Sequence, residues 1–280
     1  MTAVAVARVK GIRRYEIGIL AAGAVLAVIA VAVADPALLA RYSPYAIDPA
    51  RALTGPSGAH WFGTDADGRD VFSRVVFGAR PAVLIGVVAA GIGAVGGTAF
   101  GLLAGLGGRW TDSAVGTFTE LLLSFPGVVL ALLLATFFGA SVTVEAVAVG
   151  IGNIPTFIRL VRGQAFVVQS SAYVSAARVL GHSPRRVLLR TIVPNVLRPL
   201  LAAACLAVGQ SIVWASALSF LGLGPKPPEA EWGLMLADSE SYLSVAWWLA
   251  VFPGLAIVIT ALALTSLGTA IQRRLERSAS

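Results

Sequence analysis

The fold of this chain is decided by one uncharged stretch, PAVLIGVVAAGIGAVGGTAFGLLAGL, which occupies residues 81–106. An α-helix rises about 1.5 Å per residue, so roughly 20 apolar residues cross the ~30 Å hydrocarbon core of a bilayer. Residues 81–106 exceed that length without a single charged side chain. The stretch therefore predicts a membrane-spanning helix.

Small residues recur along this stretch at every fourth position. Because residues four apart lie on one face of a helix, such a row lets another backbone approach closely. We predict that this face packs against a second helix, in this chain or in another subunit; the alternative is the general glycine richness of a chain with 30 glycines. The row consists of Ala89, Gly93, Gly97, Gly101 and Gly105.

The rest of the composition agrees with a lipid environment. The chain of 280 residues is 57% hydrophobic and 12% charged, whereas soluble domains carry roughly 25% charged residues. We therefore predict an all-α membrane protein with six transmembrane helices. Besides residues 81–106, the predicted spans are Ile17–Ala34, Thr117–Phe138, Val142–Leu160, Val196–Leu221 and Ala246–Ile271.

The distribution of charge predicts the orientation of these spans. Lys and Arg gather at both chain ends and between the fourth and fifth spans, and cytoplasmic segments carry such an excess. Both termini are therefore expected in the cytoplasm, and the net charge of +7 needs no nucleic acid as a partner. The predicted segments are a cytoplasmic segment 1–16, a first transmembrane helix 17–34, an external loop 35–80, a core of five transmembrane helices 81–271 with a cytoplasmic loop 170–194, and a cytoplasmic tail 272–280.

The amino end allows a second interpretation. Basic residues from Lys10 to Arg14, an apolar run and the small residues Ala32-Val33-Ala34 are also typical of a cleavable signal peptide. The apolar run is longer than such peptides usually have, so we expect a retained span. Cleavage would leave five spans in the same orientation.

The loop 170–194 predicts two short helices joined by a turn. Ser170 or Ser171 can cap a helix over 172–180, and Gly181 suits a left-handed residue that ends it. Ser183 can cap a second helix with Pro184 at its first position. We expect Pro194 to end this unit before the fifth span. A basic amphipathic helix on anionic lipid is the alternative, but the small face of the first helix favours docking into a protein cleft.

The sequence lacks the residues that several kinds of functional site require. Lys10 and Lys226 are the only lysines, and neither stands in a phosphate-binding loop. Two histidines and one cysteine offer no rich metal site, so an enzyme has little support. Polar groups inside the predicted spans are few. Asn153 near Pro155 indicates a kinked helix. The backbone groups freed at the kink either face a cavity or form hydrogen bonds with neighbouring helices. The notable polar groups are Asn153, Gln210 and Ser211, while Glu120 and Glu145 fall at span ends.

The loop 170–194 resembles the cytoplasmic Glu-Ala-Ala signature loop of bacterial ABC importer permeases. The resemblance rests on Ser175-Ala176-Ala177, Gly181 and Val193-Pro194, with Ser175 in place of the usual Glu and Val193 in place of the usual Leu. In that family the loop forms the coupling helix that docks in a groove of the ATPase. The resemblance implies a coupling role for Tyr173, Ser175, Ala176, Ala177, Gly181, Ser183, Pro184, Arg185, Arg186 and Pro194.

A second resemblance covers roughly residues 58–271. His60-Trp61-Phe62-Gly63-Thr64-Asp65, Gly107-Gly108-Arg109-Trp110-Thr111-Asp112 and Ala217-Leu218-Ser219-Phe220-Leu221-Gly222 resemble the C-type subunit of the dipeptide/oligopeptide/nickel permease family. In the external motif, Thr64 or Asp65 can cap a short helix, and Arg69 can pair with Asp65 or Asp70. We expect a structural brace there, with substrate contact as the alternative. The motif comprises Gly63, Thr64, Asp65, Gly68, Arg69 and Asp70.

These resemblances imply a multi-pass permease of the bacterial inner membrane with the type I ABC importer fold. The implied partners are a homologous permease, two ABC ATPase subunits, an extracytoplasmic substrate-binding protein and membrane lipid, but no nucleic acid. The chain itself would hold no metal or cofactor, because ATP and Mg would bind the ATPases. Di- or oligopeptides are the expected solutes; nickel or another small solute is the alternative, and a gradient-driven carrier that acts alone is a further one.

Overall fold

The computed structural model describes residues 2–277, with side chains for residues 18–275. Within this part of the chain the secondary structure is helical, and one isolated bridge between Thr64 and Asp70 is its only β-type pairing. The predicted all-α fold is confirmed. The helices are α1 (Thr2–Ala34), α2 (Val71–Leu106), α3 (Arg109–Ser124), α4 (Gly127–Phe138), α5 (Val142–Gln169), α6 (Ala172–Val179), α7 (Pro184–Val187), α8 (Val193–Leu197), α9 (Leu200–Phe220), α10 (Trp232–Ser239) and α11 (Trp248–Arg277).

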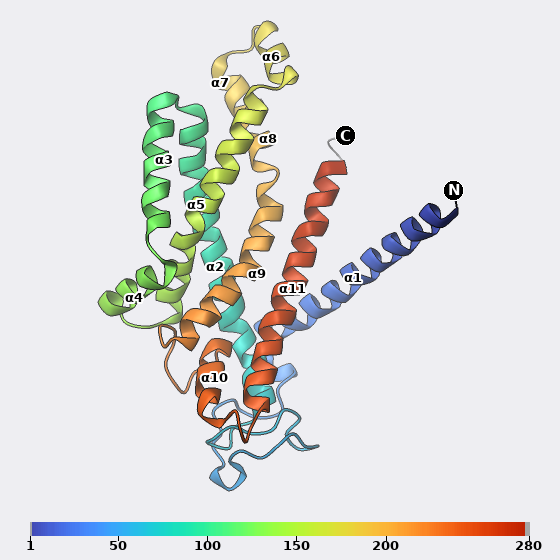
Figure 1. Cartoon of the computed structure of the whole chain (residues 1–280), viewed down its shortest axis with the longest axis vertical. Coiled ribbons are helices and arrows are strands. Elements are labelled where there is room, and N and C mark those ends of the chain that lie inside the picture. The colour runs from blue at the N-terminus through green and yellow to red at the C-terminus, as the bar shows by residue number, and fades with distance from the viewer. Residues whose placement is uncertain (1, 278–280) are drawn as a thin grey trace.

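The long helices run lengthwise between two different ends of the molecule (Figure 1). At one end, α6 and α7 form a hairpin that projects beyond the bundle; we call this the hairpin end. At the other end lie α10 and the long connection between α1 and α2; we call this the loop end. Both chain termini lie in the half of the molecule that carries the hairpin, and α1 diverges from the bundle.

Among the residues whose placement is described, four helices are long and apolar enough to cross a membrane: α2, α5, the stretch Pro184–Phe220 that ends in α9, and Trp248–Leu275 of α11. The bent pair α3 and α4 would make a fifth span. The apolar part of α1 whose side chains are described, Gly18–Ala34, is shorter. Each predicted apolar stretch therefore falls on a helix or helix pair.

The third predicted span is not straight. The chain bends by 80° between α3 and α4, at Phe125 and Pro126. Phe125 takes an extended conformation because a proline disfavours the helical region for the residue before it. The predicted span 117–138 therefore falls on a bent helix pair, and its first helix begins earlier than predicted, at Arg109.

Helix α2 begins earlier than hydropathy predicted. Asp70 caps it by accepting a hydrogen bond from the Ser73 backbone N–H at 2.8 Å, so the helix starts at Val71 and continues through Pro81. The last ten residues of the predicted loop 35–80 are thus helical. The charged side chains of Arg74 and Arg80 hid this extension, because hydropathy reports apolar length and not helix length.

Helices α2 and α5 make the closest contact in the bundle, through the predicted row of small residues. A Cβ atom added at Gly97 would lie 2.2 Å from the Cβ of Phe157, which is far inside contact distance. Helix α5 is unbroken through Pro155, so the residues facing the row also recur at every fourth position. The facing pairs are Gly93 with Asn153, Gly97 with Phe157, Gly101 with Val161 and Gly105 with Ala165.

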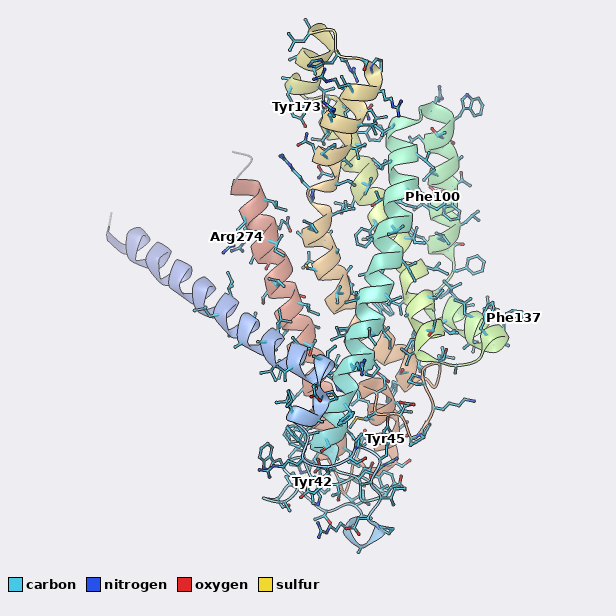
Figure 2. All side chains as sticks on the ribbon, turned by 180° about the vertical axis from the view of Figure 1, so that it is seen from behind. Tyr42, Tyr45, Phe100, Phe137, Tyr173 and Arg274 are labelled. Atoms are coloured by element: carbon cyan, nitrogen blue, oxygen red, sulfur yellow. The ribbon has the colours of Figure 1, made fainter. Side chains whose placement is uncertain are left out.

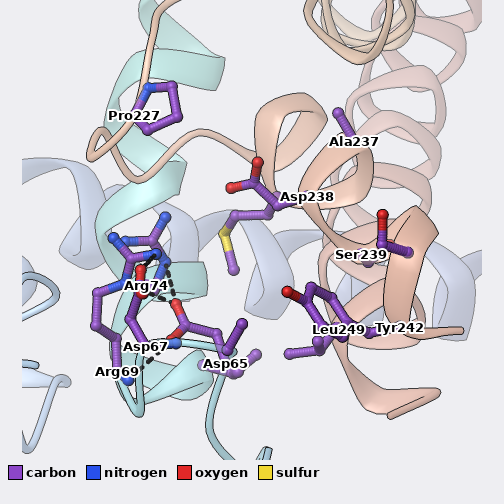
Figure 3. A pocket seen from close by; sticks show the side chains of 14 residues that line it. Asp65, Asp67, Arg69, Arg74, Pro227, Ala237, Asp238, Ser239, Tyr242 and Leu249 are labelled. Atoms are coloured by element: carbon purple, nitrogen blue, oxygen red, sulfur yellow. Dashed lines mark hydrogen bonds and ion pairs between the residues drawn. The ribbon is translucent and has the colours of Figure 1, made fainter. Parts of the chain in front are cut away.

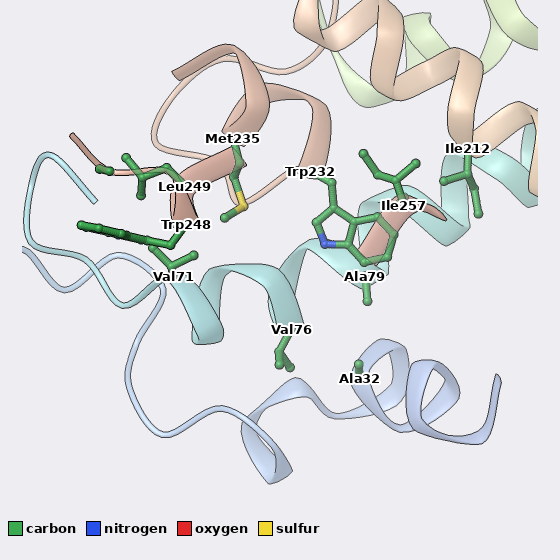
Figure 4. Close-up of a cluster of buried hydrophobic side chains, with 12 residues drawn as sticks. Ala32, Val71, Val76, Ala79, Ile212, Trp232, Met235, Trp248, Leu249 and Ile257 are labelled. Carbon is green, nitrogen blue, oxygen red and sulfur yellow. The ribbon is translucent and has the colours of Figure 1, made fainter. Parts of the chain in front are cut away.

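At the loop end, two indole rings join α10 to α2 and α11 to the connection between α1 and α2 (Figure 4). Trp232 donates its Nε1–H to the Val75 carbonyl at 2.8 Å, and Trp248 donates its own to the Thr64 carbonyl at 3.1 Å. Both rings are buried in a cluster that draws on α1, α2, α9, α10 and α11. The connection is therefore part of the folded core.

The helix contact predicts a sharp difference between two glycines of α2. Gly97→Ala should destabilise the protein by about 1–3 kcal/mol, the usual cost of overpacking, because the new methyl group meets Phe157. Gly91→Ala on the same helix has no atom within 4 Å of the added Cβ and should not destabilise it. Thermal unfolding of the purified protein in detergent measures both, and equal melting temperatures would contradict the close contact.

Candidate functional site

The turn of the hairpin is closed by a Schellman motif. Gly181 has φ of +77°, the left-handed conformation that glycine adopts without strain. The Gly181 N–H donates to the Arg178 carbonyl at 3.0 Å, and the His182 N–H donates to the Ala177 carbonyl at 3.2 Å. This pair of hydrogen bonds ends α6 at Val179 and reverses the chain toward α7.

The second helix of the hairpin does not end at Pro194, and that prediction is wrong. Residues 188–192 form a π-helical turn in which the Val193 N–H donates to the Leu188 carbonyl. The Asn195 side chain satisfies the Thr191 carbonyl at 2.6 Å. This wider turn accommodates a residue that lacks an N–H, so α7, α8 and α9 follow one another with only short breaks.

The hairpin is anchored to the end of α5 by apolar contacts. Val174 of α6 and Val187 of α7 are buried in one cluster with Val161, Ala165 and Val168 of α5. Neither Ser171 nor Ser183 makes the side-chain capping bond that the sequence suggested, although both hold the N-cap position. Packing therefore holds the hairpin in place.

The outer surface of the hairpin combines apolar and basic side chains. Val179 is 87% exposed and Leu180 is 75% exposed, although both are apolar. A surface cavity of about 300 Å³ beside them is lined by Ser183, Arg185, Arg186, Leu189 and Arg190. Figure 2 shows Tyr173 at this end and Tyr42 and Tyr45 at the opposite end. Such a surface suits a protein partner with an apolar groove and acidic rim.

Most of the sequence-predicted hairpin residues lie on this surface. Tyr173, Ser175 and Ala176 are exposed, while Ala177 is half-buried. Val179, Leu180 and Leu189, large apolar side chains that the fold leaves exposed, were not among the residues predicted from the sequence. Nothing in local sequence separates them from Val174 and Val187, which are buried. The remaining predicted residues, all exposed, are Gly181, Ser183, Pro184, Arg185, Arg186 and Pro194.

At the loop end, the external motif forms a turn braced by ion pairs. Asp65 accepts from the backbone N–H of Asp67 and of Arg69, and Arg69 pairs with Asp65 at 2.7 Å and with Asp67 at 2.6 Å. No helix begins at Thr64 or Asp65, so the predicted cap there is wrong. Gly63 and Gly68 both have positive φ, as the turn requires.

Asp70 has a different role from the pairing with Arg69 that we considered. Its side chain accepts from His60 Nδ1 at 2.8 Å and from Ser73, whose backbone N–H and hydroxyl both donate to it. His60, Asp70 and Ser73 are all buried. The network joins the loop to the first turn of α2.

The ion-paired turn of Asp65, Asp67 and Arg69 lines a cavity of about 450 Å³ between the loop, α10 and α11 (Figure 3). Arg74 is almost fully buried in its wall and donates to the backbone carbonyls of Pro44, Pro228 and Glu229. Asp238 faces the cavity from α10, and partial desolvation raises its pKa, while Arg74 and Arg69 oppose the shift. The cavity therefore carries charges of both signs.

Two buried carboxyl groups, those of Glu145 and Glu231, lie near the start of α10. Glu231 caps α10 by accepting from the backbone N–H of Gly233 and of Leu234; burial raises its pKa, and these hydrogen bonds oppose the rise. Glu145, in the first turn of α5, accepts from the Ser219 hydroxyl at 2.9 Å. These contacts connect α5, α9 and α10.

A further cavity of about 250 Å³ lies among the membrane-depth helices. It is lined by α5 and α9 and by the bend between α3 and α4. Two of the polar residues singled out in the sequence, Asn153 and Gln210, line it. Ser211 lies behind Asn153 and accepts a hydrogen bond from its Nδ2 at 2.9 Å. Among the described residues, no group of His, Cys, Asp and Glu side chains could hold a metal ion.

Solved structures with the same fold include ABC transporters. The protein in inward-facing structures of a methionine ABC transporter gives a TM-score of 0.61 at 17% identity, covering 72% of this chain and 96% of the other. A structure of an amino acid ABC transporter gives 0.58 at 17% identity, with 72% and 94% covered. At this identity the likeness establishes the fold, which is that of type I ABC importer permeases.

Sequence relatives are closer. The chain is 40% identical over 241 residues to the probable D,D-dipeptide transport system permease of Escherichia coli strain K12, covering 86% of this chain and 81% of that protein. It is 35% identical over 268 residues to the dipeptide transport system permease of Alkalihalophilus pseudofirmus, with 95% and 88% covered. It is 37% identical over 263 residues to the glutathione transport system permease of Pectobacterium atrosepticum, with 94% and 87% covered.

Residues 97–280 match the family described as the binding-protein-dependent transport system inner membrane component. The match spans the hairpin, the bent pair α3 and α4, and every helix that follows them. The relatives align over most of this chain and over most of their own length. The family match and these alignments together establish the family of the chain. The chain belongs to the family of inner membrane components of binding-protein-dependent transport systems.

Proposed function

We propose that this chain is a permease subunit that imports di- or oligopeptides and is driven by ATPase subunits bound to its hairpin. The observation that carries the proposal is the hairpin itself, whose turn is closed by two backbone hydrogen bonds and which exposes Val179 and Leu180 on the same unit as a basic cavity. Members of this family are inner-membrane transport subunits. The peptide as solute is supported by the dipeptide and glutathione permeases among the relatives.

We infer that the hairpin end faces the cytoplasm, with the termini 1–16 and 272–280 and the loop 170–194 on that side. The hairpin carries Arg178, Arg185, Arg186 and Arg190, in keeping with the excess of basic residues on cytoplasmic segments. The loop end, with most of residues 35–80, would face outward toward the substrate-binding protein. Its acidic groups include Asp48, Asp65, Asp67 and Asp238.

The connection from α7 to α9 offers a route for mechanical coupling. Because α7, the π turn, α8 and α9 succeed one another with only short breaks, a displacement of the hairpin would be carried to α9. Helix α9 lines the membrane-depth cavity through Gln210 and Trp214. ATP and Mg would bind the two ATPase subunits, and a homologous permease would close the other side of the path.

Reconstitution tests the function as a whole. The complex purified with its partner subunits, placed in liposomes with the binding protein, should accumulate alanylalanine or glutathione only when ATP is supplied on the hairpin side. A chain that purifies alone and transports without ATP would instead be a gradient-driven carrier, and the proposal would fall.

Gly181 should be essential for coupling. Gly181→Val places a β-branched residue at φ +77°, which costs about 1–2 kcal/mol, or a factor of roughly 5–30 in the population of the native turn. Peptide imported per ATP hydrolysed should fall, while expression and membrane insertion survive.

Gly181→Asn is the matched control, because Asn tolerates the left-handed conformation and no atom lies within 4 Å of the added Cβ. It should keep most of the coupling. Normal uptake by the Val variant would contradict the coupling role of the turn.

The exposed apolar pair should hold the ATPase. Burial of an apolar side chain contributes about 1.5–3 kcal/mol, so Val179→Ser combined with Leu180→Ser should weaken ATPase binding by at least about tenfold. Trp110→Ser removes a side chain that is 90% exposed on α3 and should leave binding unchanged. Copurification of the ATPase from solubilised membranes measures both, and full retention by the double variant would count against docking there.

A further inference from the structure

The membrane-depth cavity presents polar side chains where lipid would penalise them. Gln210 and Thr156 are both exposed on helices that are otherwise apolar enough to span a bilayer. An uncompensated amide in hydrocarbon is costly, so polar groups at this depth usually face a water-filled path or a binding site. Gln210 and Thr156 line the same cavity.

The helical register aims these groups at one space. On α9, Gln210, Trp214 and Leu218 are each four residues apart and therefore share one face. On α5, Asn153 and Thr156 are three apart and also share a face. The two faces meet at the bend between α3 and α4.

The hydrogen-bonding capacity of these side chains is largely unused. Asn153 is positioned by its bond to Ser211 and by its contact with Gly93, and that bond uses its Nδ2 while no contact occupies its Oδ1 among residues 18–275. Within the same range, the side chains of Gln210 and Thr156 make no hydrogen bond to another group of the protein. Together they offer amide and hydroxyl groups that both donate and accept.

The described residues that line this cavity include no charged side chain. This contrasts with the loop-end cavity, which carries Asp65, Arg69, Arg74 and Asp238. Neutral donors and acceptors match the main-chain N–H and C=O that every peptide carries, whatever its side chains. They bring no charge that would neutralise the ends of a peptide or a metal cation.

We propose that Asn153, Thr156 and Gln210 form a solute-contact subsite that hydrogen-bonds to the main-chain amide of a passing di- or oligopeptide, with Trp214 as an apolar wall. This inference rests on the proposed function and assigns the residues that meet the solute. The volume of about 250 Å³ holds several waters at about 30 Å³ each, so a peptide unit can replace them.

A substitution cycle isolates this contact. Uptake by the intact reconstituted complex is measured for alanylalanine and for the matching depsipeptide, in which an ester oxygen replaces the amide N–H. The binding protein is the same in every arm, so its own preference cancels. The informative quantity is the ratio of uptake efficiencies for amide and ester.

Gln210→Met keeps the length of the side chain and removes its hydrogen bonds. The amide-to-ester ratio should fall about fivefold, the equivalent of one hydrogen bond. Thr156→Val, which is nearly isosteric, should lower the ratio in the same direction and serves if the first variant fails to assemble. Val213→Leu, on an exposed position of α9 outside the cavity, should leave the ratio unchanged.

The outcomes separate the two proposals. If the wild-type complex imports alanylalanine with ATP but neither polar variant changes the ratio, the subsite is overturned and the importer stands. A ratio that also falls in the Val213 variant would overturn it too, because the effect would not be local. If the wild-type complex imports no peptide, the proposed function itself fails.

Discussion

Close contact between α2 and α5 is the constraint on which the rest of the structure depends. Between membrane helices lipid is as apolar as the side chains, so association rests on packing at short range. Four glycines of α2 leave no room for a side chain where Asn153, Phe157, Val161 and Ala165 of α5 approach. Helix α5 is thereby held along nearly its whole length.

Both functional regions are attached to that helix. The hairpin is anchored on Val161, Ala165 and Val168 near the carboxyl end of α5, and the membrane-depth cavity opens on Asn153 and Thr156 nearer its middle. Helix α9 completes both, because it follows the hairpin in the chain and carries Gln210 into the cavity. In the proposed function, a movement at the hairpin would reach the cavity through helices that are already in contact.

Prolines show why sequence reasoning succeeded in some places and failed in others. Pro81 and Pro155 lie inside uninterrupted helices, Pro126 stands at an 80° bend, and Pro194 follows a π turn. Each proline removes one N–H, but whether the helix continues depends on what satisfies the freed carbonyl. Around Pro194 the chain continues through a π turn, in which the Val193 N–H donates to the Leu188 carbonyl, and the Asn195 side chain donates to the Thr191 carbonyl; hydropathy predicts neither contact. The sequence therefore predicted the apolar spans well and their ends and bends poorly.

By itself the sequence determined the membrane solvent, the helical spans, the small-residue face of α2 and the turn at Gly181, because composition, period and a left-handed glycine are local properties. Only the tertiary structure decided which helix that face meets, that Val174 and Val187 are buried while Val179 and Leu180 are exposed, and that Asn153, Thr156 and Gln210 share one cavity. The physical reason is that burial and convergence depend on neighbours far away in the chain. Two valines on opposite faces of a short helix differ in burial only when another helix packs against one of the faces.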